Sequence, residues 1–135
     1  EALIMASIVE KETGAAADQL EVLIESVRSK ETWVVEGVYG ELIERFLQSA
    51  QHLFWLDLPW DISMARIMAR HHGSGPATDD ASFRKLLAYA AAYWQRIDTR
   101  SHATHSRLFN EFTGEKSRLT SQESVDELLG GMDRR

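Results

Sequence analysis

The sequence contains no cysteine, only two prolines and no long apolar run, and each absence excludes a class of protein. Without cysteine the chain has no thiolate nucleophile, no disulfide and no cysteine-ligated zinc. A membrane span needs about 18 to 20 apolar residues, and the longest apolar stretches are interrupted by Glu36, Asp57 and Arg66. We therefore expect no membrane span and a cytoplasmic protein.

Net positive charge is also absent. Fifteen Lys and Arg residues oppose 21 Asp and Glu residues, which gives a formal net charge of -6 over 135 residues. Because an acidic surface repels phosphate backbones, we expect no nucleic-acid partner, although a local cluster of arginines can still hold one anionic ligand. Hydrophobic residues make up 44% of the chain, enough to form the core of one compact domain over residues 1–135.

Amphipathic patterns alternate with short apolar runs along the chain. Spacings of three and four residues predict helices, and β-branched or aromatic runs predict buried strands. The apolar run Glu1–Val9 fits either a helix or a buried strand. The elements expected after it are helix 15–29, strand 32–35, helix 42–47, strand 53–58, helix 61–70, helix 83–97, a helical turn near 108–112, strand 117–119 and helix 121–129. This alternation predicts an α/β fold of three layers around a mainly parallel sheet.

Two stretches stand apart from this alternation. Residues 1–19 form an atypical N-terminal segment. Residues 71–82 begin HHGSGPATDD and contain no large apolar side chain before Phe83. A polar, glycine-containing stretch between two helices of one short domain predicts a lid loop rather than a linker.

Aromatic and histidine residues follow the predicted lid. We interpret Tyr89, Tyr93 and Trp94 as core residues rather than as a platform for stacking bases. His102 and His105 have the three-residue spacing that two metal ligands on one helix would have. Since no third ligand is evident, we interpret both as exposed polar residues of a helix.

Charged residues lie where α/β proteins bind ligands. Glu36 follows the first predicted strand after the N-terminal segment, Asp57 follows the next one, and Arg66 and Arg70 share one helix face. A carboxylate that holds hydrated Mg²⁺ and arginines that neutralise phosphate oxygens would suit a magnesium-bound or phosphorylated ligand. The alternative is structural: strand-end acids that cap the following turn or helix, and arginines paired with acids on a solvated face.

The segments WVVEGVYG, HLFWLDLPWDISMARIMAR, LLAYAAAYWQR, HSRLFNEF and GEKSRL together resemble the adenylate-kinase-like P-loop proteins of the topology modulation type. The resemblance covers Leu20 to Leu129. It implies a nucleotide or nucleoside kinase-like domain that transfers the γ-phosphoryl group of ATP, with Mg²⁺, to a small acceptor.

The resemblance also implies roles for individual residues. Glu36 would carry the magnesium-linked carboxylate, and Gly37 and Tyr39 would border the acceptor site. The remaining implied contacts, all to phosphate groups, are Arg66, Arg70, Arg96 and Arg100. Apart from the resemblance, its position after a strand makes Asp57 a second candidate metal ligand, with a structural role as the favoured alternative.

One motif of that family is missing. No G-x-x-x-x-G-K-[ST] occurs in the sequence, so the backbone nest and the lysine that hold the β and γ phosphates are absent. Two explanations of the missing motif stay open: the motif lies upstream of Glu1 in a longer protein, or the domain is degenerate. We expect the chain as given to be inactive. A sheet without its central strand would leave unpaired edges, which predicts strand insertion from another chain or a homodimer and suggests an interaction module as an alternative function.

The first fourteen residues support a third hypothesis. EALIMASIVEKETG resembles the segment of endolytic murein transglycosylases that carries their catalytic glutamate, which would be Glu10, with Glu12 nearby. A glutamate with a raised pKa can protonate a glycosidic oxygen. However, nothing after Ala17 continues that resemblance, and the rest of such a substrate groove does not fit in this chain.

Overall fold

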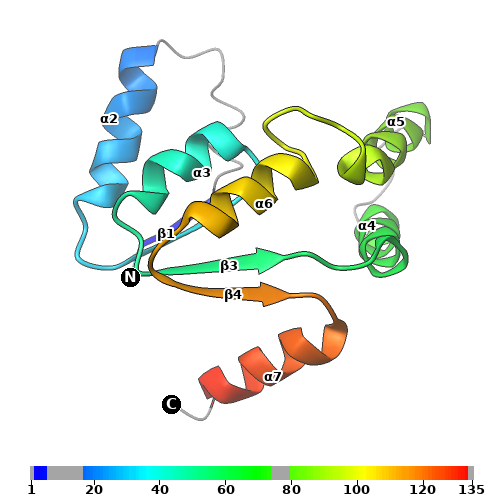
Figure 1. Cartoon of the computed structure of the whole chain (residues 1–135). Coiled ribbons are helices and arrows are strands. Elements are labelled where there is room, and N and C mark those ends of the chain that lie inside the picture. Colours follow the sequence, from blue (N-terminus) through cyan, green and yellow to red (C-terminus); the bar gives the residue numbers. More distant parts are fainter. Residues whose placement is uncertain (1, 6–16, 74–79, 134–135) are drawn as a thin grey trace.

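A computed structural model describes residues 2–5, 17–73 and 80–133 (Figure 1). The elements in chain order are β1 (Ala2–Met5), α2 (Ala17–Arg28), β2 (Trp33–Glu36), α3 (Gly40–Leu47), β3 (His52–Leu56), α4 (Trp60–Gly73), α5 (Asp80–Ala91), the 3-10 turn η1 (Ala92–Trp94), α6 (His102–Glu111), β4 (Glu115–Leu119) and α7 (Gln122–Asp133). The α/β class predicted from the sequence is confirmed, and the undecided N-terminal run contributes a strand.

The four described strands form two separate parallel pairs. In the first, β1 pairs with β2 from Ala2 opposite Trp33 to Met5 opposite Glu36. In the second, β3 pairs with β4, with a register that places His52 opposite Glu115. Parallel pairing is expected for strands that are separated by helices. Within the described residues no ladder joins β2 to β3, so these four strands do not make one continuous sheet.

One core lies between α2, α3 and one face of β2. Ile24 and Val27 of α2 and Phe46 of α3 are buried, and the Trp33 ring lies 5.6 Å from the Phe46 ring. Ile24 and Val27 belong to the apolar stripe that the sequence pattern predicts for α2. On the outside, Arg45 donates two hydrogen bonds to the Glu21 carboxylate, and this interaction lowers the pKa of Glu21.

A second core lies between α6 and one face of β3. Trp55 and Leu108 are buried there, and the Trp55 ring lies 5.6 Å from the Phe109 ring. Figure 1 shows α2, α3 and α6 on one side of the strands and α7 on the other side of β3 and β4.

The strands at 32–35 and 53–58 were predicted to be buried, and this is wrong for one face of each. Val34 of β2 is 61% exposed and Leu56 of β3 is 55% exposed, while their neighbours Val35 and Trp55 point into the two cores. Side chains alternate between the faces of a strand, and the face that carries Val34 or Leu56 is left largely open by the described helices.

The lid and the helix after it differ from their predicted bounds. Helix α4 continues through His71 to Gly73 and α5 begins at Asp80, so both ends of the predicted lid are helical. The part between them, residues 74–79, lies outside the described residues. Helix α5 ends at Ala91 rather than at Ile97 and passes into η1. Tyr89 and Trp94 were predicted to be core residues, but each is 37% exposed, because the chain leaves the helix before its apolar face can continue.

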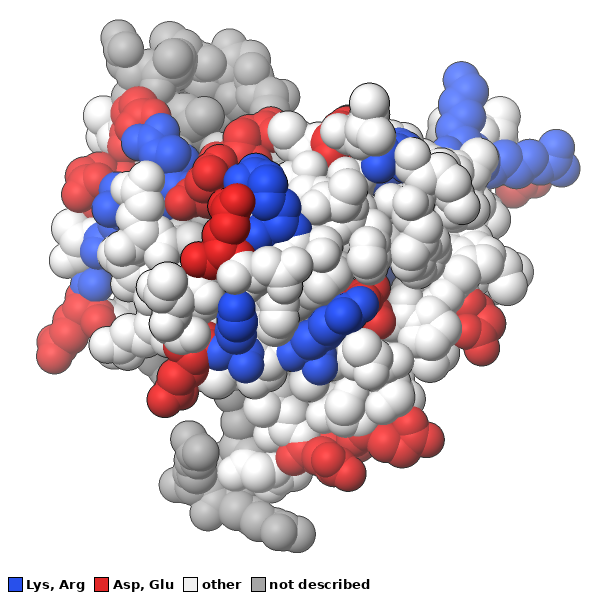
Figure 2. All heavy atoms as spheres, viewed as in Figure 1, with Lys and Arg blue, Asp and Glu red and all other residues white. Residues whose placement is uncertain are grey.

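Charged side chains of both signs are interspersed over the face in Figure 2. Acidic side chains gather at the bottom of this view over α7, which contains acids but neither lysine nor arginine. Basic side chains project at the upper right, where α5 carries Arg84 and Lys85. In the described part of the chain no helix has the length and apolarity that crossing a membrane requires.

Candidate functional site

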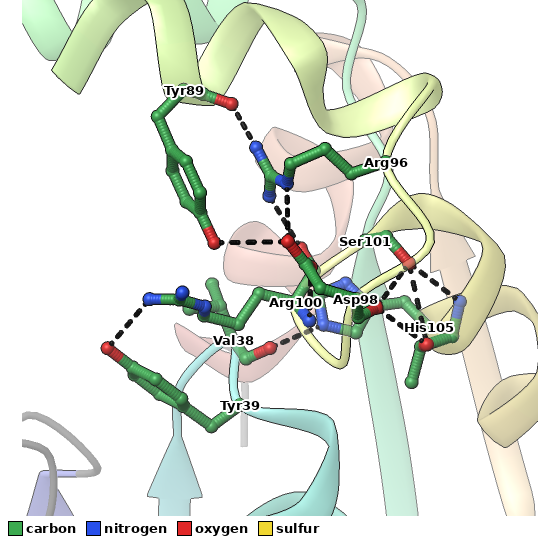
Figure 3. A network of polar contacts seen from close by, with 9 residues as sticks. Val38, Tyr39, Tyr89, Arg96, Asp98, Arg100, Ser101 and His105 are labelled. Carbon is green, nitrogen blue, oxygen red and sulfur yellow. Dashed lines mark hydrogen bonds and ion pairs between the residues drawn. The ribbon is translucent and has the colours of Figure 1, made fainter. Parts of the chain in front are cut away.

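Two arginines and two tyrosines stack beside the loop that follows β2 (Figure 3). The Arg96 guanidinium carbon lies 3.6 Å from the centre of the Tyr89 ring. The Arg100 guanidinium carbon lies 4.8 Å from the Tyr89 ring and 5.0 Å from the Tyr39 ring. Together with Asp98, these residues form what we call the Tyr–Arg cluster: Tyr39, Tyr89, Arg96, Asp98 and Arg100.

Asp98 supplies the negative charge at the centre of the cluster. One of its carboxylate oxygens lies 3.0 Å from Arg96 Nε, and the other accepts the Arg100 backbone N–H at 2.9 Å. Arg96 also donates to the carbonyl oxygen of Tyr89, and Arg100 donates to the Tyr39 hydroxyl at 3.3 Å. A carboxylate therefore occupies a position where the Arg96 guanidinium and the Arg100 backbone amide converge, and guanidinium and backbone N–H groups are also donors that proteins offer to phosphate.

The loop that carries the cluster is fixed at its base by small residues. Ser101 is fully buried and caps α6: its hydroxyl accepts the Thr104 N–H at 3.3 Å and donates to the Asp98 carbonyl oxygen at 2.6 Å. The N–H of Gly40 donates to the Thr99 carbonyl oxygen at 2.8 Å, which joins this loop to the start of α3. The cluster is thus positioned by two elements that are far apart in the sequence.

The structure brings some of the sequence-predicted site residues together. Arg100, predicted as a phosphate contact, contacts Tyr39, which was predicted to border the acceptor site. Arg96, the other predicted phosphate contact, donates to the Arg100 carbonyl oxygen. Arg66 and Arg70 do share α4, but Arg66 donates to the side-chain oxygen of Gln122 at the start of α7.

The acids predicted to bind metal lie at the ends of two different strand pairs. Glu36 is exposed at the end of β2. Asp57 follows β3, and its side chain, only 7% exposed, accepts hydrogen bonds from Arg118. His102 Nε2 lies 3.2 Å from the other oxygen of this carboxylate. Asp57 is therefore engaged by a cation, which is a poor environment for a second cation.

Across the described ranges 2–5, 17–73 and 80–133, no group of three His, Asp or Glu side chains is placed to hold a metal ion. Glu10 and Glu12, the candidates from the resemblance to transglycosylases, lie outside those ranges.

Both histidines of α6 are hydrogen-bonded, so their interpretation as exposed polar residues is wrong. Besides the contact of His102 with Asp57, His105 Nδ1 lies 2.7 Å from the Tyr93 hydroxyl, and His105 Nε2 lies 2.6 Å from the Val38 carbonyl oxygen. Burial lowers the pKa of His105 and raises the pKa of Tyr93 to about 12. The only sequence signal was the three-residue spacing of the histidines, and it places both on one helix face without indicating their partners.

Comparisons of the chain with known protein families, with curated proteins and with solved structures find no match.

Proposed function

We propose that this chain is a nucleotide-kinase-like domain whose Tyr–Arg cluster holds the phosphate of a small nucleotide. The observation that supports the proposal most is the contact of Arg100 with Tyr39, which lies 61 positions away, with Arg96 bonded to the Arg100 carbonyl oxygen. The resemblance of the sequence to adenylate-kinase-like proteins independently implies phosphate contacts for the two arginines and an acceptor contact for Tyr39.

The chemistry of the cluster suits such a ligand. The guanidinium groups offer paired donors to phosphate oxygens. Without a ligand, Asp98 neutralises Arg96, so a bound phosphate would replace this carboxylate. This exchange requires Asp98 to give up its contact with Arg96 and its bond from the Arg100 N–H.

Transfer of a phosphoryl group needs parts that the described residues do not supply. The sequence has no phosphate-binding loop for ATP, and Asp57 is paired with Arg118, which leaves Glu36 as the carboxylate for Mg²⁺. In our proposal an additional strand between β2 and β3 would join the two strand pairs into one sheet of a three-layer fold. We therefore expect nucleotide binding without turnover.

Calorimetric titration of AMP, ADP and ATP, each with Mg²⁺, tests the proposal. We expect saturable binding of at least one nucleotide, and a loss of affinity of about tenfold or more for Arg100→Ala and for Arg96→Ala, since each removes a charge-assisted contact. Arg107→Ala is the matched control, because Arg107 is exposed on α6 and pairs with Glu111 outside the cluster. No saturable heat, or an equal effect of all three substitutions, would contradict the proposal.

The division of the strands into two pairs favours a second candidate function, an interaction module that pairs with a second copy of itself. The open edges of β2 and β3 carry unpaired backbone groups within the described residues, and exposed apolar side chains such as Val34 flank them.

Size-exclusion chromatography with light scattering tests this candidate. We expect twice the mass of the chain at micromolar concentration, and a shift toward monomer in Val34→Lys, which places a charge beside the open edge of β2. Val22→Lys is the control, since Val22 is 70% exposed on α2. A monomer at every concentration rules this function out.

A further inference from the structure

Three hydrogen bonds in series connect β3 to the loop between β2 and α3. The indole Nε1–H of Trp55 donates to the Tyr93 hydroxyl oxygen at 3.2 Å. The Tyr93 oxygen lies 2.7 Å from His105 Nδ1, and His105 Nε2 lies 2.6 Å from the Val38 carbonyl oxygen, the contact visible in Figure 3. The series joins four segments that are separate in sequence: β3, η1, α6 and the loop that carries Tyr39.

The two ends of the series fix the direction of every bond in it. An indole N–H can only donate and a carbonyl oxygen can only accept. His105 must therefore carry its hydrogen on Nε2, and Nδ1 must accept the hydroxyl hydrogen of Tyr93. The other neutral tautomer would place the Nε2 lone pair against the carbonyl oxygen of Val38. One protonation state of the imidazole satisfies all three bonds.

Protonation of His105 removes the acceptor of the Tyr93 hydroxyl hydrogen and leaves the bond to Val38 in place. With a hydrogen on Nδ1, the imidazolium becomes a second donor toward the Tyr93 oxygen, which already accepts from Trp55. The hydroxyl hydrogen of Tyr93 then has no acceptor in the series, and leaving a half-buried donor unpaired is unfavourable. Tyr93 cannot respond by ionising at neutral or acidic pH, because burial raises its pKa to about 12.

We propose that His105 is a pH-sensitive latch, which ties η1 to the loop after β2 while its imidazole is neutral and releases η1 when the imidazole is protonated. The charged and titratable groups around it are His102 on the same helix, Tyr93 on η1, and Arg96 and Asp98 on the loop before α6; Asp57 and Arg118 act on Tyr93. The latch does not depend on nucleotide binding, but the Val38 carbonyl that it holds directly precedes Tyr39 of the cluster.

The direction of the pH effect follows from linkage. Burial lowers the pKa of His105 in the folded protein, with a smaller opposing contribution from the bond to Val38. In the unfolded chain a histidine titrates near its ordinary pKa of about 6.5. The unfolded state therefore binds more protons below this pH, so the contribution of the latch to stability is complete above about pH 6.5 and is lost as the pH falls below it.

Nuclear magnetic resonance of the ¹⁵N-labelled chain tests the latch directly, because long-range correlations show which imidazole nitrogen carries the hydrogen. We expect His105 at neutral pH to be protonated on Nε2 only, and to titrate at a lower pH than a histidine in an unstructured peptide. The Trp55 indole N–H resonance should move with the same midpoint. A hydrogen on Nδ1 at neutral pH, or an ordinary titration midpoint, would overturn the proposal.

Two substitutions separate a latch from a merely structural histidine. His105→Gln offers one donor and one acceptor but does not titrate, so we expect the melting temperature to fall less between pH 7 and pH 5 than in the wild type. Tyr93→Phe removes the hydroxyl that bonds to Nδ1, and the His105 midpoint should move toward the peptide value. An unchanged pH dependence in His105→Gln, or an unchanged midpoint in Tyr93→Phe, counts against the latch. If His105→Gln does not fold, the titration of His105 in the spectra of the wild type and of Tyr93→Phe still distinguishes a latch from a structural histidine.

Discussion

Replacement of Gly40 by alanine is expected to lower the free energy of unfolding by about 3 kcal/mol, the upper end of the usual cost of forcing atoms into a packed site. Gly40 is the first residue of α3, and a methyl group there would lie 2.5 Å from the Thr99 carbonyl oxygen and 2.6 Å from Thr104 Cγ2. The Thr99 oxygen also accepts the Gly40 N–H. The backbone at Gly40 and the backbone at Thr99 would therefore have to move apart.

Gly130→Ala is the matched control for this substitution. Gly130 lies in helix α7, and a methyl group there would meet no atom within 4 Å. The same substitution of glycine by alanine is expected to raise the free energy of unfolding by about 0.5 to 1 kcal/mol, because alanine loses less conformational freedom than glycine on entering a helix. Denaturant unfolding of both variants measures the two effects, and the same sign for both would contradict the steric argument.

The Gly40 contact also links stability to the candidate site. The loop that it holds carries Asp98 and Arg100, so a displaced loop would separate Arg100 from Tyr39. In our proposal Gly40→Ala therefore weakens nucleotide binding under conditions where the variant is still folded. Gly130→Ala should leave binding unchanged.

The helix 15–29 was predicted well because its signal is local, whereas the bounds of α5 and α6 were missed. The apolar stripe of α2 follows directly from spacing, and its residues Ile24 and Val27 are buried as expected. Strands were predicted in the right places, but their burial was not, because a run such as LFWL reads the same whether helices cover one face or both. The division into two pairs could not be predicted either, since pairing depends on residues distant in the sequence.

The candidate site was predicted only in part, for a similar reason. The resemblance to a known family named Arg96, Arg100 and Tyr39, but it did not indicate that Asp98 pairs with Arg96. Asp57 was identified from its position after a strand, yet its partner Arg118 lies 61 residues further along, and no spacing rule connects them. The partners of a buried charge are decided by packing, and packing places the Arg118 guanidinium against Asp57.

Asp57→Asn is the second substitution with a large expected effect, a loss of about 2 kcal/mol in the free energy of unfolding. The change keeps the size of the side chain and removes its charge, so the Arg118 guanidinium loses a carboxylate that it contacts through two nitrogen atoms. The cost stays below that of a fully buried ion pair, because the Arg118 side chain is 48% exposed and can turn toward water.

The interaction energy between Asp57 and Arg118 can be separated from the effects of their other contacts by combining Asp57→Asn with Arg118→Gln. If the two charges stabilise each other, the double variant is less destabilised than the sum of the single variants, by about 1 kcal/mol. Asp61→Asn is the control: Asp61 is exposed in the first turn of α4, and its substitution should change stability by about 0.5 kcal/mol or less. Additive effects at Asp57 and Arg118 would instead show that Asp57 is held mainly by His102 and the α6 core, and that Arg118 is free to serve an anionic ligand.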